Sequence, residues 1–328
     1  MNGLLGQDSI LAAIRKMLDE GKLPTSFLIS GPRGSGRKTL ARLAARGFNC
    51  EEGRFAESCL CPSCKRVDQG MHPEVHWLGL DKEASSIKIE AIHQLIHWAG
   101  YKTTGAAKKI FVLVDAERMT DDAANALLKT LEEPPAGTHI FLLAENPARL
   151  WETIVSRCFH IKMRPVPVES LTRALRERLS CAEEEARVLA KSSQGRFGRA
   201  LELAGENFRE MRRRFLEEVL RDPGPALEEW SGRKRQEIVK ELEFFSLLLR
   251  DMLVYKETQD RSLLYHENIE PFFVTWTERL GRENLSALFE AVEETRRALE
   301  DYVNPKLAVF RLGMIFQAAG AESGRFPS

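Results

Sequence analysis

A glycine-rich stretch near the amino terminus has the residue types and spacing that bind phosphate. Its glycines have the spacing of the pattern G-x-x-x-x-G-K-[ST], in which backbone N–H groups and the start of a helix converge on an anion. Arg37 replaces the lysine of that pattern and Lys38 replaces the hydroxyl residue that helps to hold magnesium, while Thr39 comes one place late. We therefore expect a retained phosphate loop with a lost ligand, and tight ATP binding is the less favoured alternative. The candidate nucleotide-binding residues of the loop are Gly31, Gly34, Gly36, Arg37, Lys38 and Thr39.

Four cysteines follow closely along the chain, and their spacing is typical of a metal site. The run Cys61-Pro-Ser-Cys64 is the kind of tight turn that zinc favours, and four thiolates close a tetrahedral site with no position left for water. We expect a structural zinc module over residues 50–64, with free or redox-active thiols as the alternative. The single residue between Cys59 and Cys61 leaves the geometry of one ligand open. The candidate ligands are Cys50, Cys59, Cys61 and Cys64.

A third candidate is an acidic residue that follows a buried strand. Residues 110–114 form an unbroken apolar run that is rich in β-branched side chains, so we expect a strand buried on both faces. Asp115 follows at once, in the place where nucleotide-binding α/β sheets carry out metal and water chemistry. Thr120 is a helix N-cap candidate, and the helix after it must stop before Pro134.

These residues need a fold that brings the carboxyl ends of strands together. Strands and helices alternate to about residue 164, which predicts a mostly parallel sheet with helices on both faces. Pro165 and Pro167 mark a boundary, and the apolar spacing beyond them is helical. We divide that half into a small helical domain over residues 166–205 and a larger one over residues 206–328. The strands expected in the first half are residues 26–30, 75–80, 110–114, 138–144 and 159–163.

Composition narrows the class of protein. Lys and Arg together number 48 in the 328 residues, as do Asp and Glu, so the formal net charge is zero. That balance argues against a protein that coats nucleic acid by bulk charge. We find neither a signal peptide nor an apolar run long enough to span a membrane, and we expect a cytoplasmic protein. A reducing compartment favours metal over disulfides for clustered cysteines.

Taken together, four motifs resemble the clamp-loader subunits of bacterial DNA polymerase III, which are AAA+ proteins. The resemblance is densest over residues 1–165 and continues more weakly into the helical half. It implies an AAA+ P-loop domain with an inserted zinc module, then a helical lid domain over 166–205 and a helical collar that joins subunits over 206–328. The motifs are Gly31-Pro32-x-Gly34-x-Gly36, the four-cysteine insertion, NALLKTLEEPP from Asn125 to Pro135, and Ser156-Arg157-Cys158.

The resemblance also assigns roles to single residues. In this family the arginine of the Ser-Arg-Cys motif acts in trans, so Arg157 is expected to contact the γ-phosphate held by a neighbouring subunit. Without the family, a lone arginine in this place is usually a solvated surface residue. Arg199 falls at the position of the sensor-2 arginine, with a salt bridge that fixes the lid as the alternative. The polar residue that the family has at the end of the strand before Asn146 falls at Ala144 or Glu145.

Departures from the family pattern indicate which kind of subunit this is. Ungapped alignment on NALLKTLEEPP puts Val114 at the Walker B aspartate and Asp115 at the neighbouring glutamate, and a shift of one residue puts Ala116 at the glutamate. Either way the acidic pair is incomplete. Arg37 and Lys38 already depart from the residues that ATP hydrolysis needs, and the incomplete acidic pair is a second departure that affects the same reaction. We expect an accessory subunit without ATPase activity of its own, and an active gamma/tau-like ATPase is the alternative.

The partners and cofactors are those that the resemblance implies. The chain would be a component of the DNA polymerase holoenzyme and would assemble with gamma/tau and delta subunits through its AAA+ and collar domains. The complex would act on the sliding clamp and primer-template DNA, with no membrane involved. Zinc would be structural, and ATP with Mg²⁺ would bind mainly to the neighbours. A free-standing zinc protein that binds nucleic acid is a further alternative, which predicts tight, salt-sensitive DNA binding by the isolated chain.

Overall fold

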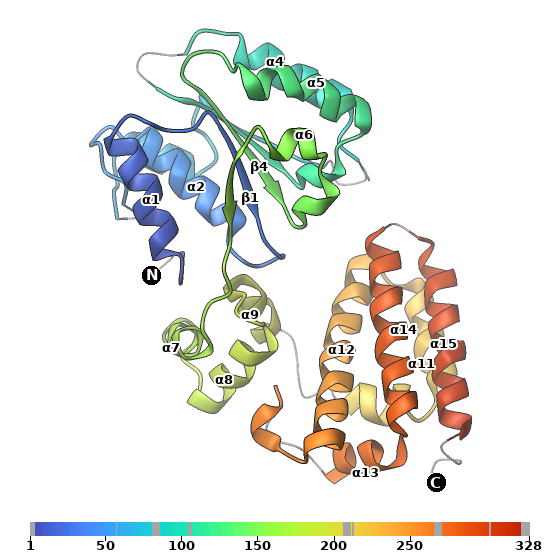
Figure 1. Cartoon of the computed structure of the whole chain (residues 1–328). Coiled ribbons are helices and arrows are strands. Elements are labelled where there is room, and N and C mark those ends of the chain that lie inside the picture. Colours follow the sequence, from blue (N-terminus) through green and yellow to red (C-terminus); the bar gives the residue numbers. More distant parts are fainter. Residues whose placement is uncertain are drawn as a thin grey trace. The chain divides into compact units, whose positions relative to one another are not determined.

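The structure is a computed structural model, and it divides into two compact units (Figure 1). It describes residues 4–56, 58–80, 86–103, 107–205, 211, 213–265, 271–301 and 303–322. One unit contains residues 1–183 and 193–201, and the other contains residues 184–192 and 202–328. Each unit has its own hydrophobic core, so we describe them separately.

A five-stranded parallel sheet forms the centre of the first unit. The strands lie in the order β2-β3-β4-β1-β5, which places β1 between β4 and β5. Because all neighbours are parallel, the carboxyl ends of β1, β3 and β4 meet at one edge of the sheet. The predicted parallel sheet with helices on both faces is confirmed. The strands are β1 (Ser26–Ser30), β2 (Val75–Leu78), β3 (Lys109–Val114), β4 (Thr138–Ala144) and β5 (Phe159–Lys162).

Helices cover both faces of this sheet, as the alternation of apolar residues along β1 requires. Phe27 and Ile29 pack with α1 and α2, whereas Leu28 packs with α4, α5 and α6 on the other face. Figure 1 shows the two sets of helices on opposite sides of the strands. The helices are α1 (Asp8–Asp19), α2 (Arg37–Phe48), α4 (Ile89–Ala99), α5 (Asp121–Glu132) and α6 (Glu152–Val155).

The local sequence determines where helix α5 begins and ends. The Thr120 hydroxyl oxygen accepts a hydrogen bond from the Ala123 N–H at 3.3 Å, which confirms the predicted N-cap. Leu127 and Leu131 are buried on its apolar stripe, and the helix ends at Glu132, before Pro134. The remaining elements of this unit before α8 are α3 (Pro62–Asp68), η1 (Ala116–Arg118), η2 (Pro147–Arg149) and α7 (Val168–Leu179).

The boundary between the two units runs through α8 (Glu183–Ser192) and α9 (Phe197–Ala204). Residues 193–201 belong to the first unit, whereas residues 184–192 belong to the second. The expected division into residues 1–165, 166–205 and 206–328 stays a prediction.

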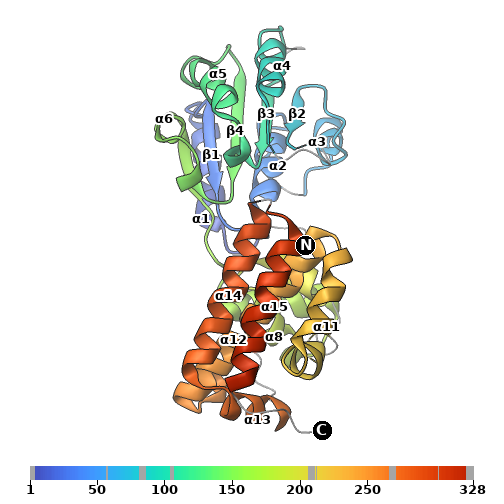
Figure 2. The same cartoon turned by 90° about the vertical axis from the view of Figure 1, so that its right-hand side faces the viewer.

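The second unit is entirely helical in its described residues, as expected. Its core packs around the buried side chains of Trp230, Phe244 and Phe245. Figure 2 shows α11, α12, α14 and α15 side by side, and these helices contact one another. Among the described helices, none is both long and apolar enough to cross a bilayer. The elements are η3 (Phe215–Val219), α11 (Pro223–Glu228), η4 (Glu229–Gly232), α12 (Arg235–Thr258), η5 (Arg261–Leu263), α13 (Pro271–Arg279), α14 (Arg282–Glu300) and α15 (Pro305–Glu322).

Candidate functional site

The glycine-rich loop joins the carboxyl end of β1 to α2, as predicted. The three glycines have positive φ angles of 152° at Gly31, 81° at Gly34 and 97° at Gly36. A Cβ atom on Gly34 would lie 2.7 Å from the backbone nitrogen of Arg199, so only glycine fits there. Gly36 is the N-cap of α2, so the loop leads directly into the first turn of that helix, where the backbone N–H groups have no partner within the helix.

The candidate sensor-2 residue lies directly against this loop. Gly198, at the start of α9, donates its N–H to the Gly34 carbonyl oxygen at 3.0 Å. The next residue, Arg199, is buried. The structure therefore brings Gly34 and Arg199 together, although they are far apart in the sequence.

The three residues after Gly36 differ in their surroundings. Arg37 is half-buried, and its Nη1 atom is buried without a hydrogen-bond partner, as is the Ser35 hydroxyl oxygen. Lys38 and Thr39 are exposed on the first turn of α2. The loop thus keeps one cation inward, and its other two candidates face solvent.

An acidic residue that sequence reasoning missed lies near this cation. Asp115 follows β3 in the left-handed conformation, with φ 55°, and Glu117 comes two residues later in η1. Burial raises the pKa of the Glu117 carboxyl above its usual range, and the nearby Asp115 charge adds to the rise, whereas the Arg37 guanidinium opposes it. The Glu117 Oε2 atom is buried without a hydrogen-bond partner. The only sequence signal for Glu117 was its place just beyond a buried strand.

A second carboxylate faces the loop from the end of β4. The Glu145 Oε1 atom lies 3.4 Å from the backbone nitrogen of Arg33, which is a long contact. The Glu145 N–H donates to Glu117 Oε1 at 2.8 Å, so the two acidic residues are linked. Of the two positions expected for the polar residue at this strand end, Glu145 contacts the loop through its side chain, whereas Ala144 accepts from the Gly31 N–H through its carbonyl oxygen at 3.2 Å. Glu117 and Glu145 thus place two acidic side chains beside the loop.

Arg157 lies in a different part of the first unit, just beyond α6. Its Nε donates to Glu132 Oε1 at 2.6 Å, its Nη2 forms an ion pair with the same oxygen, and its Nη1 donates to the Thr153 carbonyl oxygen at 2.8 Å. Its side chain is 32% exposed. Burial raises the pKa of the neighbouring Cys158 thiol to about 12, which keeps it protonated at neutral pH.

The four candidate metal ligands come together as predicted. Their sulfur atoms all lie within 4.8 Å of one another, and the one-residue spacing between Cys59 and Cys61 does not prevent this. The Cys61 sulfur lies 3.5 Å from the backbone nitrogen of Cys64, and the Cys50 sulfur lies 3.3 Å from that of Arg54. Such N–H groups stabilise thiolates, so the group could bind a metal ion.

Charge around the cysteines also suits a metal. Burial opposes ionisation of the Cys61 thiol, but hydrogen bonds from the backbone of Cys64 and Glu51 outweigh burial and lower its pKa to about 7. Burial raises the pKa of Cys64. The buried Arg46 donates from Nη2 to the Cys59 carbonyl oxygen at 2.7 Å, which places a cation beside the cluster. A four-thiolate site would carry net negative charge with a divalent ion, and this cation would offset part of it.

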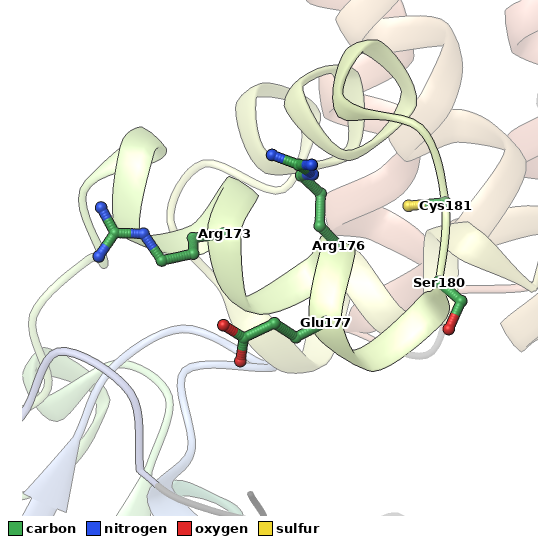
Figure 3. A pocket seen from close by; sticks show the side chains of 5 residues that line it. All are labelled: Arg173, Arg176, Glu177, Ser180 and Cys181. Atoms are coloured by element: carbon green, nitrogen blue, oxygen red, sulfur yellow. The ribbon is translucent and has the colours of Figure 1, made fainter.

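A shallow depression of 380 Å³ at the carboxyl end of α7 is not a convergent site. Figure 3 shows that its side chains point in different directions instead of toward a common centre. One of its arginines, Arg176, already donates to Glu183 at 2.8 Å. The lining residues are Arg173, Arg176, Glu177, Ser180 and Cys181.

Comparison with known proteins places these features in context. Residues 6–167 match the family model described as DNA polymerase III, delta subunit. The chain is 28% identical to DNA polymerase III subunit delta' of Bacillus subtilis (strain 168) over 326 residues, which cover 95% of this chain and 96% of that protein. It is 31% identical to DNA polymerase III subunit tau of Escherichia coli (strain K12) over 209 residues. That alignment covers 62% of this chain but only 32% of the tau subunit, so the chain spans about a third of that relative's length.

Proposed function

Because this chain belongs to the family of bacterial DNA polymerase III clamp-loader subunits, we propose that it is a delta-prime-type accessory subunit. It does not hydrolyse ATP itself, and it supplies Arg157 to a neighbouring ATPase subunit. The observation that carries this proposal is the similarity to a delta-prime subunit over nearly the whole of both chains, set against partial coverage of tau.

The geometry of the phosphate loop supports the absence of hydrolysis. Arg37 and Lys38 occupy the places of the lysine and hydroxyl of an active loop, and Lys38 is exposed. Glu117 and Glu145 put carboxylates beside the loop, where they repel the negative charge of a triphosphate. The lost magnesium ligand and the repulsion of anions both weaken ATP binding. The loop therefore has a structural role and is not an ATP site.

The surroundings of Arg157 support the trans-acting role. The residue follows a short helix at the surface of the first unit and keeps a third of its side chain exposed. A guanidinium in such a place can reach a phosphate on another chain and stabilise the charge that develops on it during hydrolysis.

The metal at the cysteine group is zinc, with a structural role. A set of four sulfur ligands, without carboxylate or imidazole, is the donor set that tetrahedral zinc takes in structural sites. When bound, zinc would tie the segment before α3 to that helix through Cys50, Cys59, Cys61 and Cys64. No coordination position would remain for water, so this metal takes no part in hydrolysis.

The partners follow from the family. The chain assembles with gamma/tau and delta subunits in the polymerase holoenzyme, in the cytoplasm, and the assembly loads the sliding clamp onto primer-template DNA. The second unit acts as the collar that joins subunits. An exposed apolar stripe on α15 supports the collar role, and it consists of Leu307, Phe310 and Met314.

Nucleotide binding and hydrolysis by the purified chain test the accessory role. We expect no ATP hydrolysis above a no-protein control and no saturable binding of a fluorescent ATP analogue. Hydrolysis that is abolished by Asp115→Ala would overturn the proposal and favour the active gamma/tau-like ATPase. Tight, salt-sensitive DNA binding by the isolated chain would instead favour a free-standing nucleic-acid-binding protein.

A further inference from the structure

Arg157, which follows α6, contacts Glu132 at the end of α5. Glu132 is the last residue of α5, within the NALLKTLEEPP motif, and Arg157 is the second residue after α6. One carboxylate oxygen, Glu132 Oε1, faces both Nε and Nη2 of the guanidinium. The Thr153 carbonyl oxygen accepts from Nη1 at 2.8 Å. The guanidinium is therefore held on two sides within its own chain.

We propose that Glu132 is a positioning residue for Arg157. It fixes the orientation of the guanidinium so that the remaining N–H groups are presented to a phosphate of the neighbouring subunit. The inference rests on the proposed trans-acting role of Arg157.

The number of donors on arginine leaves room for this second contact. A guanidinium has five N–H donors in a rigid planar fork, and the contacts to Glu132 and Thr153 use three of them. Two N–H groups remain on a side chain that is still 32% exposed. A phosphate can therefore bind without displacing Glu132.

Holding the side chain in advance favours the reaction. A long, flexible arginine that is free in solution loses rotamer freedom when it meets a phosphate, and this loss weakens the contact. If Glu132 has already restricted the side chain, folding supplies that order before the neighbour arrives. A group that must stabilise a transition state benefits most from such preorganisation.

The Glu132 charge has an opposing effect, which is weaker. A carboxylate beside the guanidinium reduces its attraction for a phosphate, but the Glu132 side chain is 49% exposed and water screens its charge. The restriction of the side chain is not screened in this way. We therefore expect the positioning effect to exceed the loss of attraction.

The place of Glu132 in its helix is also difficult to explain by helix stability. The carboxyl end of a helix carries partial negative charge, so an acidic residue there is unfavourable. Glu132 occupies the last position of α5, and its ion pair with Arg157 compensates that unfavourable placement. Glu133, the next residue, is exposed and offers a matched control of the same type and place.

The test compares five variants with wild type in an assembly reconstituted with gamma/tau and delta subunits, and it measures the ATPase rate stimulated by clamp and primed DNA. We expect Glu132→Ala to lower kcat by about three- to tenfold with little change in KM for ATP, because the order of a catalytic group is lost while ATP binding is not. Glu132→Gln keeps a carbonyl oxygen as acceptor and should recover part of the rate. Glu133→Ala should match wild type. The double variant Glu132→Ala/Arg157→Ala should be no slower than Arg157→Ala alone.

The outcomes separate the two levels of the proposal. If Arg157→Ala leaves the rate unchanged, the proposed trans-acting role fails. If Arg157→Ala lowers the rate but Glu132→Ala is as fast as wild type or faster, only the positioning role is overturned. Size exclusion checks that each variant enters the assembly. Should Glu132→Ala fail to assemble, Glu132→Gln carries the test, and an unchanged rate for that variant overturns the inference.

Discussion

At the scale of single residues, Glu117 combines a carboxyl group with burial, and this combination makes stability depend on pH. Burial raises its pKa above the ordinary value of 4.5, so the folded state binds the proton more tightly than the unfolded state. The group therefore favours the folded state fully below pH 4.5, and that contribution is lost as pH rises through the higher folded pKa. Above the folded pKa, ionisation of the buried Glu117 carboxyl destabilises the folded state.

We predict that Glu117→Gln raises the free energy of unfolding at pH 7 and gives no gain at pH 4. Urea denaturation of both proteins at a series of pH values measures the difference. Glu90→Gln, an exposed residue of α4, is the control and should show no such trend. If the difference in unfolding free energy between the two proteins is constant with pH, the Glu117 carboxyl does not have a raised pKa in the folded state.

Glu117 and Glu145 also affect nucleotide binding. If repulsion by these two groups helps to exclude triphosphate, Glu117→Gln/Glu145→Gln should bind an ATP analogue at least about tenfold more tightly than the upper limit of affinity that the titration sets for wild type, equivalent to about 1.4 kcal/mol. Fluorescence titration at low salt measures the affinity, and added salt should narrow the difference because it screens charge. Equal affinities in the two proteins would show that the loop is closed to nucleotide for another reason.

At the scale of elements, the cysteine group ties α3 to the segment that precedes it. Metal binding that depends on the folded arrangement contributes to folding stability. We predict that the purified chain contains one equivalent of zinc, and that Cys64→Ser loses it and melts at a lower temperature. Atomic emission and thermal denaturation measure the two effects. Cys181→Ser, outside the group, should retain the metal, and a zinc-free wild-type protein would contradict the assignment.

Elements whose signals are local could be predicted from the sequence. The strand over residues 110–114 and the helix that starts after Thr120 follow from apolar spacing and a cap, and the cysteine group follows from residue spacing. The strand expected over residues 75–80 ends two residues earlier, since β2 spans Val75–Leu78. The ends of strands and helices depend on hydrogen bonds that apolar spacing does not specify.

The contacts that give the site its character could not be predicted in this way. Glu132 and Arg157 are 25 residues apart, and Arg33 and Glu145 are 112 apart. Sequence spacing carries no information on which carboxylate meets which hydrogen-bond donor across such separations. Only the parallel sheet, with β4 beside β1, brings Glu145 to the loop.

At the scale of the whole molecule, the proposed collar role predicts which surface of the chain contacts other subunits. Leu307, Phe310 and Met314 are 66%, 68% and 58% exposed and lie at helical spacing on α15. Such a stripe is costly in water and favours burial against another protein. We predict that Leu307→Ser/Phe310→Ser weakens binding to the other subunits by at least about tenfold, because large apolar side chains dominate interface energies.

Analytical ultracentrifugation of the mixed subunits measures that binding. The isolated variant should melt at the wild-type temperature, since both side chains are exposed. Glu283→Ser, an exposed polar residue of α14, serves as the control. Full assembly of the double variant would contradict a role for this face of α15.

The most direct measurement is the clamp- and DNA-stimulated ATPase rate of the reconstituted assembly, with this chain as wild type and as Arg157→Ala. If the chain serves its neighbour's site and not its own, kcat should fall by at least about tenfold, which is about 1.4 kcal/mol of barrier, while size exclusion shows an intact assembly. An unchanged rate would contradict the trans-acting role and return attention to the chain's own loop between β1 and α2.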